Sequence, residues 1–157
     1  MAEPQTSPQP TGVPLSVNLQ YLKDLSFESP RAPQVFVAEG PQSQVGVNVR
    51  VDGRGVGENT YEITLHLEVA ATAGDAQVFL VEMDYAGIFT VPQLPPEVLG
   101  PLLMIEAPRM LFPFARQIVS ATVAAGGFPP LLINPIDFAD LYRRQIAAQV
   151  QADPAQA

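Results

Sequence analysis

The chain contains no cysteine, no tryptophan and only one histidine, His66, among its 157 residues. The lack of cysteine excludes a disulfide framework, a thiol nucleophile and a thiolate metal site. A single imidazole makes a poor metal site, so we expect His66 to be a solvated strand residue rather than a ligand or general base. Basic residues are also scarce, because 8 Lys and Arg stand against 16 Asp and Glu, for a formal net charge of -8. This charge argues against nucleic acid and anionic membranes as partners and favours basic ones.

Catalytic and targeting motifs are missing as well. There is no nucleophile elbow, no Walker sequence and no HExxH helix. Carboxylate pairs occur at Asp24 and Glu28 and at Glu82 and Asp84, but acids on an open sheet face lack the partly dry pocket that catalytic acids need. We therefore expect no enzymatic activity, no cofactor and no bound metal. Met1–Pro4 does not resemble a signal peptide, and prolines or charges interrupt every apolar stretch before it could span a bilayer, which predicts a soluble cytoplasmic protein with no membrane insertion.

Despite its acidity the chain is rich in apolar residues. Hydrophobic residues make up 47% of the chain and its mean hydropathy is +0.15. The length suits a single domain that buries a core without covalent staples. We expect part of the remaining apolar surface to lie in a subunit interface or a binding groove.

Three consecutive segments between Val45 and Tyr85 place an apolar residue at every second position, which is typical of strands with one covered face. An earlier strand is predicted at residues 15–28, with Asp24 and Glu28 on its polar side. The last strand ends near Val91 and is unusual because its outer row is half apolar. That row reads Val78, Leu80, Glu82 and Asp84, and we interpret it as a docking surface.

The connections between these strands carry turn signals. The glycines at 53, 55 and 57 precede a strand and not a helix, so we interpret them as a mobile hairpin turn rather than a phosphate loop. Gly74-Asp75 fits a primed two-residue turn. The long loop at residues 29–44 carries the apolar triplet Val35–Val37. Either this triplet pins the loop to the core, or Phe36 lines a groove.

After Pro92 the pattern becomes helical. A short helix is predicted from Glu97 to Glu106, an interruption at Pro108, and a longer piece to about Ala125 with a left-handed exit at Gly126-Gly127. The longer piece is apolar nearly all round, so either it lies deep in a large core or its second side packs on another subunit; a single sheet favours the oligomer. A last helix follows Asn134-Pro135 and carries the stripe Phe138, Leu141, Tyr142 and Ile146.

Four motifs occur in a specific order and spacing. They are residues 21–30 (YLKDLSFESP), 85–89 (YAGIF), 111–116 (LFPFAR) and 127–138 (GFPPLLINPIDF). Together they resemble the SecB family of bacterial protein-export chaperones, over roughly residues 15–150. The resemblance implies an α+β fold with a four-stranded antiparallel Greek-key sheet, a long broken helix and a C-terminal helix on one face, assembled into a dimer-of-dimers tetramer. Residues 1–14 and 151–157 would be disordered tails.

The same resemblance implies a function and its sites. Family members hold unfolded precursor proteins in the cytoplasm without ATP and deliver them to the SecA motor. The SecA-binding positions fall on Asp24, Glu28, Leu80 and Glu82, and the zinc of this contact belongs to SecA. The client groove would be lined by Phe36, Val45, Val47, Val49, Phe128, Phe138, Leu141 and Tyr142, although the valines could equally be core residues.

Two features of the chain depart from the family pattern. Many relatives carry a Trp in the loop after the first strand, where this chain has Gly40-Pro41, which predicts a shallower aromatic part of the groove. The short, nearly uncharged tail after Val150 leaves open whether it makes a second SecA contact. Two other functions also remain open, a chaperone dedicated to one partner such as an antitoxin and a carrier of a small ligand.

Overall fold

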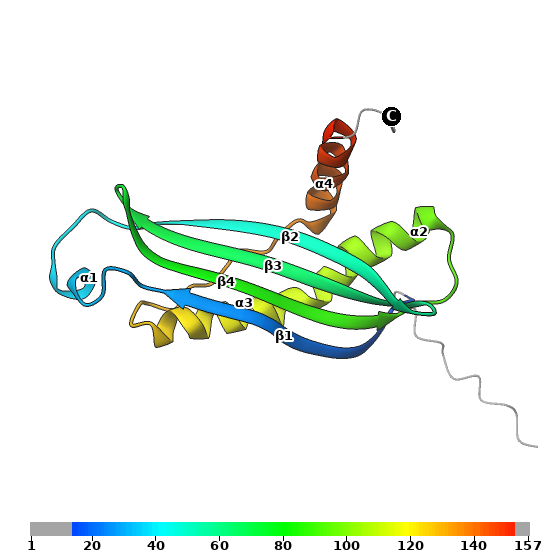
Figure 1. Ribbon diagram of the computed structural model, residues 1–157, viewed down its shortest axis with the longest axis horizontal. Coiled ribbons are helices and arrows are strands. Elements are labelled where there is room, and N and C mark those ends of the chain that lie inside the picture. Colours follow the sequence, from blue (N-terminus) through cyan, green and yellow to red (C-terminus); the bar gives the residue numbers. More distant parts are fainter. Residues whose placement is uncertain (1–13, 153–157) are drawn as a thin grey trace, which may run out of the picture.

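The computed structural model describes residues 14–152 (Figure 1). The predicted tails therefore lie outside the described residues, except for Pro14 and for residues 151 and 152, which belong to the last helix. The elements, in chain order, are β1 (Ser16–Glu28), α1 (Gln34–Val37), β2 (Gln44–Gly57), β3 (Thr60–Ala73), β4 (Ala76–Thr90), α2 (Pro96–Pro101), the π-helical segment η1 (Leu102–Glu106), α3 (Ala107–Ala125) and α4 (Phe138–Ala152).

The strands form one antiparallel sheet in the order β1-β4-β3-β2, which confirms the predicted four-stranded sheet and the α+β class. β1 and β2 are its edges. The predicted turn between β3 and β4 is present, with Gly74 at a φ of 62°. The predicted mobile glycine loop is wrong, because Gly53 and Gly55 pair with Ile63 and Tyr61 inside the β2–β3 ladder.

The helical region is continuous, whereas the sequence predicted two helices separated at Pro108. α2, η1 and α3 form one helix of 30 residues, Pro96–Ala125, which runs along one face of the sheet (Figure 1). Pro108 does not interrupt it; the wider π-helical turn just before this proline gives its ring room. By length and composition this helix could cross a membrane, contrary to the expected lack of such a stretch, but its inner side is buried on the sheet, as in the core helix of a layered domain.

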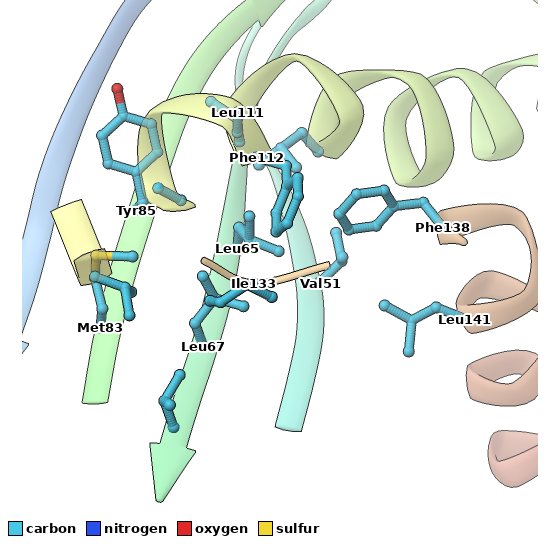
Figure 2. Packing of buried hydrophobic residues seen from close by; sticks show 14 of the residues in the cluster. Val51, Leu65, Leu67, Met83, Tyr85, Leu111, Phe112, Ile133, Phe138 and Leu141 are labelled. Atoms are coloured by element: carbon cyan, nitrogen blue, oxygen red, sulfur yellow. The ribbon is translucent and has the colours of Figure 1, made fainter. Parts of the chain in front are cut away.

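The core lies between α3 and the inner rows of β3 and β4. Leu65, Leu67 and Met83 from the sheet meet Leu111 and Phe112 from α3 (Figure 2). Phe138 and Leu141 from the first turns of α4 close one end of this core. The rest of α4 does not lie flat on the sheet but projects beyond β2 (Figure 1). As a consequence, Phe138 and Leu141 are its only buried residues.

β1 does not keep the simple alternation that its sequence predicts. The register shifts between Val17 and Leu19 and again between Leu22 and Asp24. Each shift moves the following side chains to the opposite face of the sheet. Strict alternation from Asp24 would place Tyr21 and Lys23 on the inner face. Instead Leu22, opposite Tyr85, lies on the inner face, and Tyr21, opposite Ala86, lies on the outer one.

A buried carboxylate on the outer face ties three strands together. Glu62 of β3 is only 6% exposed, although its position in the alternation predicted a wet residue. It accepts a hydrogen bond from the Tyr21 hydroxyl, and its Oε1 lies 3.0 Å from both Lys23 Nζ and Arg54 Nε. The small, fully buried Ala86 pairs with Tyr21 and leaves room for the β1 side chains to reach across β4. β1, β2 and β3 are thereby linked through one charge.

The same contacts shift two pKa values. The hydrogen bond from Tyr21 lowers the pKa of Glu62 most, and Lys23 and Arg54 lower it further against the effect of burial, from 4.5 to about 2. Burial, followed by the bond to Glu62, raises the pKa of Tyr21 to about 12. Because the folded pKa of Glu62 lies below its unfolded value, the carboxylate stabilises the fold above pH 4.5 and loses that effect as the pH falls towards 2.

We expect Glu62→Gln to lower the free energy of unfolding at pH 7 by up to about 3 kcal/mol, the equivalent of that pKa shift. Urea unfolding from pH 7 to pH 3 checks this, and the gap between wild type and variant should narrow below pH 4.5. Glu58→Gln, an exposed turn residue, is the matched control. An unchanged gap across this pH range would show that the ionised Glu62 contributes nothing to stability.

Candidate functional site

The first candidate surface is an apolar hollow beside the β2 edge, which we call the edge groove. Its volume is about 530 Å³. Val45 and Val47 are 44% and 39% exposed, so the chain itself does not bury them. The lining residues are Val45, Val47, Asn48 and Val49 from β2, Leu131, Leu132, Ile133, Asn134 and Ile136 from the connector before α4, and Leu141 and Arg144 from α4.

A second hollow of about 790 Å³ lies between the loop around α1 and the residues that follow α3. We call it the aromatic pocket. The Phe128 ring is its centre, because its centroid lies 5.1 Å from that of Phe36 and 5.0 Å from that of Phe79. Phe27 stacks on Phe79 at 6.1 Å. Phe36 remains 49% exposed while its neighbour Val35 packs on the core, so the triplet both pins the loop and lines the pocket.

The aromatic pocket depends on two adjacent glycines. A Cβ atom at Gly126 would lie 2.2 Å from Cζ of Phe27, which no real contact allows. Gly127 adopts a φ of +91°, and a Cβ there would lie 3.1 Å from Cζ of Phe36. The predicted left-handed exit from α3 is therefore at Gly127 alone, because Gly126 is right-handed with a φ of −75°. Gly126 is instead needed for the close approach of Phe27.

Two residues expected in the client groove lie elsewhere. Phe138 is 2% exposed and packs edge-on against Phe112 with ring centroids 5.9 Å apart (Figure 2). It is a core residue, and we remove it from the groove. Tyr142 lies against Gly100 of α2, outside the lining of both hollows. The other six expected residues line one hollow or the other: Val45, Val47, Val49 and Leu141 the edge groove, Phe36 and Phe128 the aromatic pocket.

The outer face of the sheet carries the second expected site. In the β1–β4 ladder Asp24 pairs with Asp84, Ser26 with Glu82 and Glu28 with Leu80, so the four expected SecA-binding residues share one face. In the next ladder Glu82 also pairs with Glu68. We call Asp24, Glu28, Glu68, Glu82 and Asp84 the acidic face. Like charges placed directly opposite each other destabilise a sheet, so this arrangement suits a basic partner.

A shallow hollow of about 300 Å³ on this face is lined by Asp24 and Glu82 among others. His66 also lines it and is not the solvated residue that the sequence predicted. Its Nε2 lies 2.6 Å from Asp52 Oδ2, and its Nδ1 contacts Asp84. Both ring nitrogens therefore face carboxylates. Register explains the prediction's failure, because Asp84 is the cross-strand partner of His66 and lies 18 residues away in the sequence.

Together these surfaces consist of two apolar hollows and one face rich in carboxylates. Within residues 14–152, no group of three or more His, Asp or Glu side chains is placed to hold a metal ion. Both hollows present exposed apolar side chains that would bind extended apolar segments. The sequence analysis did not identify Phe27 and Phe79 as supports of the Phe128 ring, because their alternation marked them only as sheet residues. It also did not place Leu131, Leu132 and Ile133 in the edge groove, because they carry no periodic signal.

Comparisons with known proteins give matches to one family over most of the chain. The family model described as "Preprotein translocase subunit SecB" matches residues 8–149. The chain is 50% identical over 139 residues to a protein-export protein SecB of Rhodospirillum centenum, covering 88% of this chain and 83% of that protein. It is 46% identical over 149 residues to one of Rhodopseudomonas palustris, covering 93% and 95% respectively.

A solved structure shares the fold at much lower identity. It is a SecB-like chaperone of Mycobacterium tuberculosis in complex with a ChAD peptide from the HigA1 antitoxin. The TM-score is 0.60 at 16% identity, over 78% of this chain and 90% of that one. With a family model matching most of its length and close relatives of the same description, the chain belongs to the SecB family of protein-export chaperones.

Proposed function

We propose that this protein is an ATP-independent cytoplasmic chaperone that holds unfolded precursor proteins and delivers them to the SecA motor. The observation that carries the proposal is the pair of open apolar hollows on the side of the sheet opposite to the acidic face. Clients and motor would then use separate surfaces. Relatives with 50% and 46% identity are protein-export proteins, whereas the antitoxin-bound neighbour is 16% identical, so export is better supported than a dedicated antitoxin partner.

Holding by these hollows would need no particular client sequence. Burial of apolar surface yields roughly 25 cal/mol per Å² whatever the side chain, so any segment with spaced apolar residues can bind. A folded protein hides such segments. Two hollows on each subunit add weak contacts through effective concentration, which gives tight yet exchangeable binding.

We expect Phe36→Ser to weaken the binding of a permanently unfolded client about 10-fold, because the variant removes an aromatic ring from the wall of the aromatic pocket. Fluorescence anisotropy with a labelled, carboxymethylated client measures the dissociation constant. Val37→Ser is the matched control, since Val37 is 81% exposed and does not line the pocket. Equal loss in both variants would mean that the pocket does not hold clients.

The acidic face is the surface we assign to SecA. Asp24, Glu28 and Glu82 supply the charge that steers a basic partner, and the half-buried Leu80 supplies apolar contact area. A contact with SecA would also explain why the apolar Leu80 lies in a row of side chains that faces solvent. Asp24 and Glu82 both line the shallow hollow, so a basic side chain placed there would contact both.

Reversing the charge of both residues, as in Asp24→Lys with Glu82→Lys, should weaken SecA binding by at least about 10-fold at low salt and less at high salt. Titration calorimetry measures this, and client holding should remain unchanged. The control pair Asp75→Lys with Glu97→Lys makes the same change in net charge away from the face. If the control pair weakens SecA binding as much, overall charge and not this face is responsible.

We also propose the dimer-of-dimers tetramer that the family resemblance implies. The position of β1 beside β4 rather than β2 supports the Greek-key topology. β1 is a free edge whose residues Val17, Leu19, Leu22 and Leu25 are 40%, 59%, 44% and 37% exposed. On α3, Phe114 is 52% exposed on the side away from the sheet. A second copy along β1 and a second dimer on α3 would cover both surfaces.

Placing a charge on one surface at a time separates the two interfaces. We expect Phe114→Glu to leave dimers and Leu22→Glu to disrupt the dimer itself, because each buries an unpaired carboxylate in the assembly. Native mass spectrometry reports the mass of each species. Val150→Glu on α4 is the control, since Val150 is also 52% exposed. A tetramer that survives both changes would place the interfaces elsewhere.

A further inference from the structure

A side chain of α4 occupies the place of a neighbouring strand at the β2 edge. The backbone N–H of Val51 donates to Oε1 of Gln145 at 3.2 Å, and Nε2 of Gln145 donates to the Val51 carbonyl at 3.2 Å. In an antiparallel ladder a residue exchanges the same pair of bonds, one donated and one accepted, with its partner strand. The amide of Gln145 therefore closes the edge at one residue.

Beyond this point the β2 edge is open. Because Val51 turns its N–H and carbonyl away from β3, the alternate residues Val49, Val47 and Val45 do so as well. Within residues 14–152 the outward backbone groups of these three valines make no hydrogen bond. Their side chains line the edge groove. Unpaired edge groups next to an apolar wall are the two features that the addition of an extended strand requires.

We propose that Gln145 marks the end of the site at which an extended apolar client segment adds to the β2 edge. The client backbone pairs with residues Val45 to Val49, about 17 Å of strand, and its alternate side chains face Leu131, Ile133 and Leu141. At Val51 the amide of Gln145 already holds both backbone groups, so pairing stops there. The inference rests on the proposed function, because it names the backbone contact by which clients are held.

A side-chain amide is suited to this role. It carries one acceptor and two donors, so it satisfies the N–H and the carbonyl of one residue without offering a strand edge of its own. The same bonds hold the middle of α4 to the sheet, where few other contacts do, since the residues of α4 after Leu141 are not buried. Gln145 thus sets both the position of α4 and the length of open edge.

Amide hydrogen exchange of β2, read residue by residue with and without a carboxymethylated, permanently unfolded client, tests the proposal. In the wild type we expect the client to slow exchange at Val45, Val47 and Val49 and to leave Val51 slow throughout. In Gln145→Ala the Val51 amide should exchange about 10-fold faster in the free protein and become protected when the client binds. Alanine favours helix, so α4 should remain folded.

Two further variants sharpen the experiment. Gln149→Ala removes the same side chain one turn further along α4, where it makes no hydrogen bond within the described chain, and should behave as the wild type. Gln145→Glu keeps the acceptor for the Val51 N–H but cannot donate to the Val51 carbonyl, so the exchange of the Val51 amide should stay slow both in the free protein and with the client bound.

The outcomes separate this inference from the proposed function. If a client is retained in native mass spectra but leaves the exchange of Val45, Val47 and Val49 unchanged, clients are held by side chains alone and the inference is wrong while the holding function stands. Unchanged Val51 exchange in Gln145→Ala also overturns it. If the wild type retains no unfolded client at all, the proposed function fails and the inference with it.

Discussion

The packing of a single helix along the middle of the sheet is the contact on which the rest of the structure depends. α3 buries Leu111, Ala115 and Val119 against β3 and β4, and one helix is too narrow to cover four strands. The edge strands β1 and β2 therefore keep exposed apolar residues on the helix side. The free edge at β1 is available to another copy of the chain, and the one at β2 opens into a groove.

The two faces of the sheet differ in the side chains that they expose. On the outer face, Glu62 pairs with Lys23 and Arg54 and fixes β1 and β2 to β3, whereas Asp24 lies opposite Asp84 and Glu68 lies opposite Glu82. The first set of charges stabilises the fold, and the second places like charges opposite each other, where we propose that a basic partner binds. The edge groove and the aromatic pocket lie away from this face, so the proposed client sites and the proposed partner site need not compete.

The sequence predicted the fold well because alternation and turn residues are local signals. The strands, the sheet, the turn at Gly74 and the outward position of Asp24, Glu28, Leu80 and Glu82 followed from spacing and from family resemblance. The prediction failed where distant residues decide the outcome. His66 and Glu62 were expected in solvent but find partners across the sheet, and Phe138, on an amphipathic stripe, fills the core against Phe112.

The aromatic pocket also depends on residues that are far apart in the sequence. The sequence predicted the aromatic part of the groove only from the missing tryptophan. In the structure Phe27 and Phe79 pack on Phe128 from two strands, and Phe36 packs on the same ring. Only the register of β1 and the absence of a side chain at Gly126 bring them together. No local pattern in the sequence carries that information.

The most direct test of the account is the native mass of the protein mixed with a slow-folding precursor, presented once unfolded and once folded. The account predicts an oligomer that retains the unfolded precursor and releases or ignores the folded one. An oligomer that ignores both forms would contradict general holding and leave only the family fold, with a dedicated partner as the function to pursue.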